Sequence, residues 1–144
     1  MNSKKYEILL VENNPGDIRI IQEIFKESKS NINLSIVNDG AETINRLKKE
    51  NNYKNALRPD IIILDLNLPK KNGFEVLKEI KSNKELKRIP VIVLTTSEFE
   101  EDISNAYDLH ANCYIKKPTD FEQFIEILKS IQGFWLNTVR LPST

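Results

Sequence analysis

The sequence predicts an α/β domain, a doubly wound parallel sheet of five strands. Short, wholly apolar runs alternate along the chain with amphipathic segments whose apolar residues recur at helical spacing. Such runs are typical of strands buried on both faces, and strands joined by helices pair in parallel through right-handed crossovers. Capping residues also stand where the helices are expected to begin.

Three of the apolar runs are continuous, at residues 8–11, 61–64 and 91–94. Residues 34–37 and 113–115 are weaker candidates that fall where the alternation places two more strands. The segments between them each form one apolar helical stripe, made by Ile18, Ile21, Ile24 and Phe25, then by Ile44 and Leu47, then by Phe74, Leu77 and Ile80.

Helix starts are marked by local signals. Asn14 before Pro15 is typical of an N-cap followed by proline at the first helical position, and Asp17 could complete this cap at N3. Capping-box spacing recurs in two further pairs, Asp39 with Glu42 and Ser97 with Glu100.

The composition excludes several classes of protein. The 21 basic and 21 acidic residues cancel, and no stretch concentrates positive charge, so nucleic-acid binding is not expected. Apolar runs are far shorter than the roughly 20 residues that span a bilayer, so we expect no membrane segment and no signal peptide, and a cytoplasmic protein. With one cysteine and one histidine, Cys113 and His110, any metal must be bound by oxygen.

The length of 144 residues suits a single domain, without room for a separate output domain. We expect this domain over residues 1–133 and an apolar extension over residues 134–144, because FWLNTVRLPST breaks the alternating pattern. Phe134, Trp135 and Leu136 would form a sticky patch if exposed. The extension either folds back over its own core or docks across a two-fold dimer.

Polar motifs stand at the ends of four apolar runs: Glu12-Asn13, Asp65, Thr95 and Lys117-Pro118. Because the carboxyl ends of parallel strands meet at one edge of a sheet, we expect these groups to lie together. Two carboxylates, a hydroxyl and an ammonium suit a magnesium ion and a phosphoryl group. Taken alone, Asp65 could merely end a strand, Thr95 could be an ordinary strand residue and Lys117 a solvated charge.

The motifs LLVEN, IIILDLNLPKKNG, VIVLTTS and YIKKP together resemble the receiver domains of two-component response regulators, the CheY-like family, over roughly residues 5 to 131. The opening ENNPGD and the ending FWLNTVRLP further resemble the single-domain regulators associated with phytochrome-type histidine kinases. The resemblance implies a flavodoxin-like strand order 2-1-3-4-5, a histidine kinase as phosphoryl donor, and output through an unidentified protein partner, with no metabolic activity. It also favours the dimer for the extension.

The resemblance implies a role for each motif residue. Asp65 is the phosphoacceptor, whose carboxylate can attack a phosphohistidine and hold an acyl phosphate. Thr95 and Lys117 bind phosphoryl oxygens. Tyr114 is the switch aromatic that responds to Thr95, although a half-buried tyrosine with a wet hydroxyl is the plainer alternative. Magnesium is held by Glu12, Asp65 and the main-chain carbonyl of Asn67, and a cis bond before Pro118 aims Lys117.

The chain departs from this pattern at several positions. Asn13 stands where the family usually has a second acid, so we expect weaker magnesium binding, with the amide oxygen as a ligand or water anchor, and slower phosphorylation. Asp17 either faces the same pocket and restores charge or serves only as a cap. Thr96 is bulkier than usual and is expected to hinder hydrolysis of the acyl phosphate. His110 replaces a common glycine and would be strained at positive φ.

Two other functions remain open from sequence. A pseudo-receiver would have lost its metal-dependent chemistry through Asn13 and would act as an interaction or dimerisation scaffold; the retained Asp65, Thr95 and Lys117 argue against it. A flavodoxin-like cofactor or nucleotide binder would need a glycine- or hydroxyl-rich phosphate loop after the first strand. Residues 12–17 carry acids there instead, which would repel phosphate in the absence of a metal.

Overall fold

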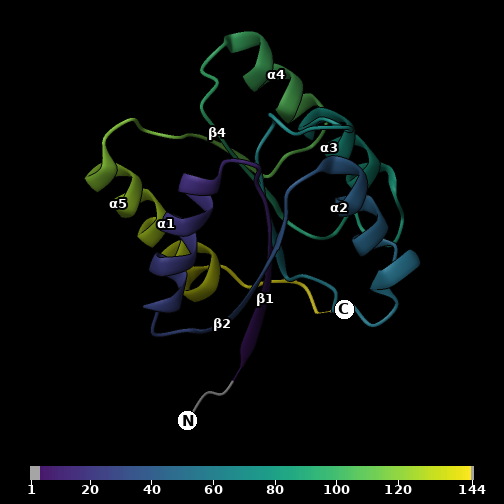
Figure 1. Ribbon diagram of the computed structural model, residues 1–144, viewed down its shortest axis with the longest axis horizontal. Helices are drawn as coiled ribbons and strands as arrows, with labels where there is room; N and C mark the ends of the chain where they lie inside the picture. The colour runs from purple at the N-terminus through teal and green to yellow at the C-terminus, as the bar shows by residue number, and fades with distance from the viewer. Residues whose placement is uncertain (1–3, 144) are drawn as a thin grey trace.

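The computed structural model describes residues 4–143, built around one parallel sheet (Figure 1). Its strands lie in the order β2-β1-β3-β4-β5, which confirms the predicted doubly wound topology. The order reverses beside β1, so the crevice at the carboxyl ends of β1 and β3 is the expected ligand site. The strands are β1 (Lys5–Val11), β2 (Asn31–Val37), β3 (Ile61–Leu64), β4 (Val91–Thr95) and β5 (Cys113–Lys116).

Helices cover both faces of the sheet (Figure 1). α1 (Pro15–Lys26) and α5 (Phe121–Gln132) pack on one face, and α2 (Gly40–Leu47), α3 (Gly73–Ser82) and α4 (Glu100–Asp108) pack on the other. Successive strand residues point to opposite faces, so Ile8 and Leu10 join the α1–α5 core while Leu9 and Val11 join the α2–α3–α4 core. Both faces of the sheet are therefore buried. A short 3-10 helix, η1 (Asn51–Tyr53), lies in the loop before β3.

Two of the predicted helix starts are confirmed and one is wrong. The Asn14 side chain accepts from the main-chain N–H of Asp17 at 3.0 Å, and Asp39 accepts likewise from Glu42 at 2.7 Å. Ser97 does not cap α4, because Phe99 is the N-cap residue and has no side-chain capping bond. The Ser97 hydroxyl instead donates to Asp102 at 2.5 Å, so the hydroxyl is engaged with a side chain inside the helix.

The C-terminal extension begins as a continuation of the last helix. Gly133 keeps right-handed helical angles, and the chain runs on as a π-helical segment, η2 (Gly133–Thr138). Leu136 is buried in the α1–α5 core, and the Tyr6 hydroxyl donates to the Leu136 carbonyl at 2.8 Å. Phe134 remains 53% exposed. The extension therefore covers its own protomer while leaving one aromatic ring outside.

Within residues 4–143, none of the helices combines the length and the apolar character needed to cross a membrane.

Candidate functional site

Four buried polar residues stand at the carboxyl edge of the sheet. Glu12 and Asp65 directly follow β1 and β3, Thr95 ends β4, and Lys117 follows β5. The pairing of Val11 with Leu64 and of Thr95 with Lys116 keeps these strand ends level. All four side chains lie below the surface, and Thr95 is wholly inaccessible. Because the parallel strands end together, residues from four separate parts of the sequence lie in one buried polar site, called the pocket.

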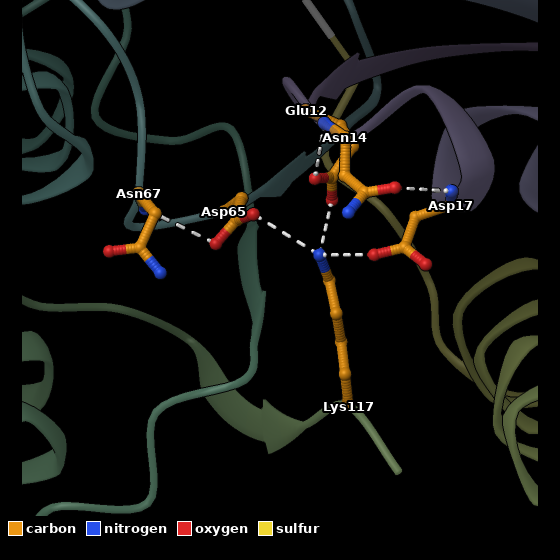
Figure 2. Close-up of polar contacts among 6 residues, drawn as sticks. All are labelled: Glu12, Asn14, Asp17, Asp65, Asn67 and Lys117. Carbon is orange, nitrogen blue, oxygen red and sulfur yellow. Dashed lines mark hydrogen bonds and ion pairs between the residues drawn. The ribbon is translucent and has the colours of Figure 1, made fainter. Parts of the chain in front are cut away.

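The Lys117 ammonium lies at the centre of this pocket, between three carboxylates (Figure 2). Its Nζ is 2.8 Å from Glu12 Oε1, 2.9 Å from Asp17 Oδ2 and 3.1 Å from Asp65 Oδ2. An ammonium has three hydrogens, so these bonds use its full donor capacity. Three carboxylates around one ammonium leave an excess of negative charge when all four groups are ionised.

Main-chain donors orient the two carboxylates at the ends of β1 and β3. The N–H of Asn14 donates to Glu12 Oε2 at 3.2 Å, and the N–H of Asn67 donates to Asp65 Oδ1 at 3.2 Å (Figure 2). Each carboxylate thus has one oxygen held by its own loop and the other by Lys117. These bonds fix the orientation of both carboxylates.

The pKa values in the pocket follow from burial and from this network. Burial raises the pKa of Glu12 to about 7, with the nearby Asp65 carboxylate adding to the rise and Lys117 opposing it. Burial alone would lower the pKa of Lys117, but the hydrogen bonds with Asp17 and Glu12 outweigh it and leave that pKa raised. The ammonium therefore stays charged, whereas Glu12 titrates near neutral pH.

The Thr95 hydroxyl has no partner. Among the residues the structure describes, its Oγ1 is the one buried side-chain polar atom that makes no hydrogen bond. Leaving a buried hydroxyl unpaired costs about 1–3 kcal/mol, so such groups in native proteins call for an explanation. A ligand oxygen bound beside the end of β4 would supply the missing partner.

Tyr114 on β5 is half-buried, and its hydroxyl donates to the main-chain carbonyl of Ser97 at 2.9 Å. Ser97 lies two positions beyond Thr95, so the ring of Tyr114 is tied to the loop that leaves the pocket. Burial raises the pKa of the Tyr114 hydroxyl. The N–H of Tyr114 also donates to the hydroxyl of Tyr107 in α4, at 3.2 Å. The hydroxyl of Tyr114 therefore has a main-chain acceptor in the loop that follows β4.

The structure decides whether Asp17 faces the pocket or serves only as a cap. Asp17 lies in the capped first turn of α1, and its carboxylate contacts Lys117. Asn13 is exposed and outside the hydrogen-bonded cluster, and Thr96 is also exposed. Among residues 4–143 no peptide bond is cis, so the expectation of a cis bond before Pro118 is wrong. The trans form is favoured by about 0.5–1 kcal/mol before proline, and Lys117 reaches the pocket from it.

His110 has a positive φ of 72°, the conformation at which a glycine would be less strained. It follows the C-cap of α4, where its N–H donates to the Tyr107 carbonyl at 2.8 Å and the N–H of Ala111 donates to the Ala106 carbonyl at 3.0 Å. These two bonds make a Schellman motif, which usually has glycine at this residue. The role of His110 in the structure is to end α4, away from the pocket.

Gly73 at the start of α3 supports the pocket in a way that the sequence analysis missed. A Cβ at this position would lie 2.5 Å from the Asp65 carbonyl oxygen and 2.4 Å from Leu66 Cα. The N–H of Gly73 donates to the Leu66 carbonyl at 2.9 Å. Only a glycine allows α3 to approach the Asp65 main chain this closely. Its place after the cap residue Asn72 was the available signal.

The donor set suits a hard divalent cation. Glu12 and Asp65 supply carboxylates, and the Asn67 main chain lies beside Asp65. Across residues 4–143, no three His, Cys, Asp or Glu side chains form a ready-made metal cluster, and the Lys117 ammonium lies between the carboxylates of Glu12 and Asp65. The excess of negative charge is the feature that would attract a cation here.

Comparison with known proteins identifies the family. Residues 8–129 match the response regulator receiver domain family. The chain is 48% identical over 136 residues to response regulator Rcp1 of Synechocystis sp., covering 94% of this chain and 92% of Rcp1. It is 36% identical to a probable methanogenesis regulatory protein, FilR2, of Methanothrix harundinacea, covering 94% of this chain and 86% of that protein.

Two solved structures are similar over nearly the whole chain. The Mn²⁺-bound form of Rcp1 has a TM-score of 0.93 and 47% identity, covering 96% of this chain and 99% of that one. The phosphorylated cyanobacterial phytochrome response regulator RcpA has a TM-score of 0.95 and 53% identity, covering 97% of this chain and all of that one.

Proposed function

This chain belongs to the response regulator receiver domain family, and on that premise we propose that it accepts a phosphoryl group from a histidine kinase on Asp65 in a magnesium-dependent reaction. The observation that carries the proposal is the unpartnered hydroxyl of Thr95, buried at the same sheet edge as Asp65 and Lys117. An acidic pocket with a spare hydroxyl donor and a fixed ammonium is suited to an anionic group that arrives with a cation.

The chemistry assigned to Asp65 is nucleophilic. Its carboxylate oxygen attacks the phosphorus of a phosphohistidine, the new O–P bond forms, the P–N bond breaks, and the electron pair returns to the imidazole nitrogen. The product is an acyl phosphate. Lys117 stays within reach of the Asp65 carboxylate and provides positive charge for one phosphoryl oxygen, and Thr95 donates its hydroxyl hydrogen to another.

A magnesium ion is the proposed cofactor. Glu12, Asp65 and the Asn67 carbonyl would hold it, with Asn13 beside them, and the ion would neutralise charge between the anionic nucleophile and the phosphoryl group. The Mn²⁺-bound form of Rcp1 supports a divalent cation in this kind of site. With an amide at Asn13 in place of a carboxylate, we expect weaker binding than a site with three acids would give.

The proposed output is a change in protein contacts. Thr95 would move toward a phosphoryl oxygen, and the loop that carries Ser97 would move with it, which alters the hydrogen bond from Tyr114. α4 and β5 would then present a different surface to a partner. The similarity to RcpA, a phytochrome response regulator, supports a phytochrome-type histidine kinase as the donor, and both proteins would meet in the cytoplasm.

Intact mass spectrometry after incubation with acetyl phosphate tests this proposal. We expect one added phosphoryl group that requires both Mg²⁺ and Asp65, so it is absent with a chelator and in Asp65→Asn. Asp60→Asn is a matched control, since it removes a carboxylate that serves the main chain of Glu7 at the opposite edge. An adduct that persists in Asp65→Asn would contradict the assignment, and no adduct from either acetyl phosphate or a cognate kinase would favour the scaffold reading.

We also propose that the protein forms a homodimer through the face that carries Phe134. This ring borders an apolar groove of about 460 Å³ lined by β5, α5 and η2, including Ile115, Ile127 and Trp135. Because Leu136 lies in the protomer's own core, deleting residues 134–144 would also damage the fold. A point substitution is the cleaner test.

Light scattering of Phe134→Ser measures the contribution of this ring. We expect the dimer to dissociate at protein concentrations where the wild type remains dimeric, with the unfolding midpoint nearly unchanged. Leu57→Ser is the matched control, since Leu57 is 60% exposed outside this groove. A wild type that is monomeric at all concentrations, or a Phe134→Ser variant that dimerises normally, would rule out this interface.

A further inference from the structure

Asp17 is the acidic residue of the pocket to which the family pattern assigns no role. It lies in the first turn of α1, and its main-chain N–H is already satisfied by the Asn14 side chain at 3.0 Å. The N–H of the cap residue Asn14 donates to Glu12 at 3.2 Å, so the Asp17 carboxylate takes no part in the cap. That carboxylate reaches across the pocket to Lys117, one hundred positions away in sequence, at 2.9 Å (Figure 2).

The three carboxylates that accept hydrogen bonds from Lys117 differ in their other roles. Glu12 and Asp65 are the carboxylates offered to a cation, and Asp65 is also the nucleophile in the proposed function. Asp17 stands on the other side of the ammonium from Asp65 and makes no other side-chain contact in the cluster (Figure 2). The Asp17 side chain is 24% exposed, so its carboxylate has a smaller desolvation cost than the buried carboxylates of Glu12 and Asp65.

The charge of the pocket explains why this acid matters. Asn13 is neutral, so without Asp17 the two carboxylates of Glu12 and Asp65 would face the full charge of Lys117. The Asp17 carboxylate compensates the positive charge of that ammonium, so the negative charge of Glu12 and Asp65 is left uncompensated. Because cation affinity depends on the charge of the ligand set, this balance sets how strongly the pocket attracts a divalent ion.

We propose that Asp17 is a positioning residue that replaces the charge missing at Asn13, acting through Lys117 rather than by touching the cation. The inference rests on the proposed function, since it assumes that the pocket binds a divalent ion. Asp17 holds the ammonium from the side of α1, so Lys117 remains in the pocket when its bond to the Asp65 carboxylate is exchanged. The charge that most receivers carry beside the first strand is here carried by the first turn of α1.

Calorimetric titration with Mg²⁺, and with Mn²⁺ as a second probe, tests the inference at constant ionic strength. For Asp17→Asn we expect a dissociation constant about fivefold higher than wild type, as the loss of one partly screened charge predicts. Asn13→Asp should bind more tightly, and the double variant Asn13→Asp/Asp17→Asn should return to within about twofold of wild type, because the charge is restored one position after Glu12.

Glu75→Gln is the matched control, because Glu75 is also the N3 acid of a helix whose cap is Asn, but it makes no contact with the Lys117 cluster. The dissociation constant of this variant for Mg²⁺ should stay within about twofold of wild type. Far-ultraviolet circular dichroism confirms folding, and Asp17→Ser replaces Asp17→Asn if the latter does not fold.

An unchanged affinity in Asp17→Asn, or a double variant no better than Asp17→Asn alone, would overturn the role of Asp17 while leaving the proposed function intact. A wild type that binds neither ion would overturn both.

Discussion

The two edges of the sheet each hold a lysine with three oxygen acceptors, and the two lysines differ in almost every other respect. At the amino edge, Lys81 donates to the main-chain carbonyls of Lys87 and Ile89 and to the Asn112 side chain, at 2.9–3.1 Å. At the carboxyl edge, Lys117 is bound by three carboxylates. Burial lowers the pKa of Lys81, whereas the acidic partners of Lys117 leave its pKa raised.

This difference indicates a structural role for Lys81 and a ligand-binding role for Lys117. Lys81 has neutral acceptors that belong to the chain entering β4 and β5, and its cluster ties α3 to those strands. Lys117 lies in a pocket with more carboxylates than cations, near a buried hydroxyl that lacks a partner. Such a pocket is less stable than it could be, and it gains interactions when a cation and an anionic oxygen enter.

The largest expected effect is on the rate of phosphorylation when the Lys117 ammonium is removed, and removal of the Lys81 ammonium is the comparison. Lys117→Met should slow phosphorylation by acetyl phosphate about 100-fold at saturating Mg²⁺, because a preorganised positive charge is lost. Lys81→Met should leave that rate within about twofold. The rate is measured by intact mass over time.

For the free energy of unfolding we expect the opposite order, with Lys81 at the amino edge contributing more than Lys117. Lys81→Met should lower the free energy of unfolding by about 2 kcal/mol, because two carbonyls and an amide oxygen lose a donor. Urea denaturation measures this. A Lys81→Met variant that phosphorylates as slowly as Lys117→Met would break the distinction between the two edges.

The next effect concerns pH. The pKa of Glu12 lies at about 7, so the carboxyl is mostly protonated at pH 6 and mostly ionised at pH 8. A cation binds the ionised form, so the affinity for Mg²⁺ should rise about tenfold over this range and level off above it. Calorimetry at a series of pH values measures the change. A flat profile between pH 6 and 8 would show that Glu12 is not a ligand.

Two buried threonines give a smaller and sharper contrast. The Thr43 hydroxyl donates to the Asp39 carbonyl at 2.8 Å, whereas the Thr95 hydroxyl has no partner. Replacing Thr43 by valine should therefore destabilise the unphosphorylated protein by about 1 kcal/mol, and replacing Thr95 by valine should stabilise it by about 1 kcal/mol. Urea denaturation of the two variants decides, and a loss of stability in Thr95→Val would mean that its hydroxyl is satisfied.

The smallest expected effect lies again at the amino edge, in the loop that carries Asn112. His110→Gly removes the cost of a side chain at positive φ and should raise the free energy of unfolding by about 0.5–1 kcal/mol. The phosphorylation rate should not change, because His110 is distant in the fold from the pocket. A thermal melt detects the gain, and a lower midpoint would mean that the imidazole makes a stabilising contact.

The strands and the capped start of α1 could be predicted because their signals are local. The run at residues 61–64 matches β3 at both ends, and Asn14 caps α1 as its position before Pro15 indicated. The strand order followed from the resemblance rather than from periodicity. The expected gathering of polar residues depended only on parallel strands ending at one edge, and the structure brings Glu12, Asp65 and Lys117 into contact.

Other features depend on packing that no local pattern encodes. The cap spacing of Asp17 is the same whether its carboxylate faces solvent or Lys117. The Tyr114 hydroxyl binds a main-chain carbonyl, an acceptor that the residue types in the sequence do not indicate. Leu136 and Phe134 differ in burial because the chain continues past Gly133 as a π-helix, which the sequence pattern after that residue did not indicate.

Phosphorylation of Asp65 is tested most directly by locating the phosphoryl group itself. Borohydride reduction of the protein treated with acetyl phosphate and Mg²⁺ converts an acyl phosphate of aspartate to homoserine, and peptide mass spectrometry identifies the position. We expect homoserine at Asp65 alone, and none when Mg²⁺ is chelated. Homoserine at Asp17 or at any other acid, with Asp65 unmodified, would contradict this assignment.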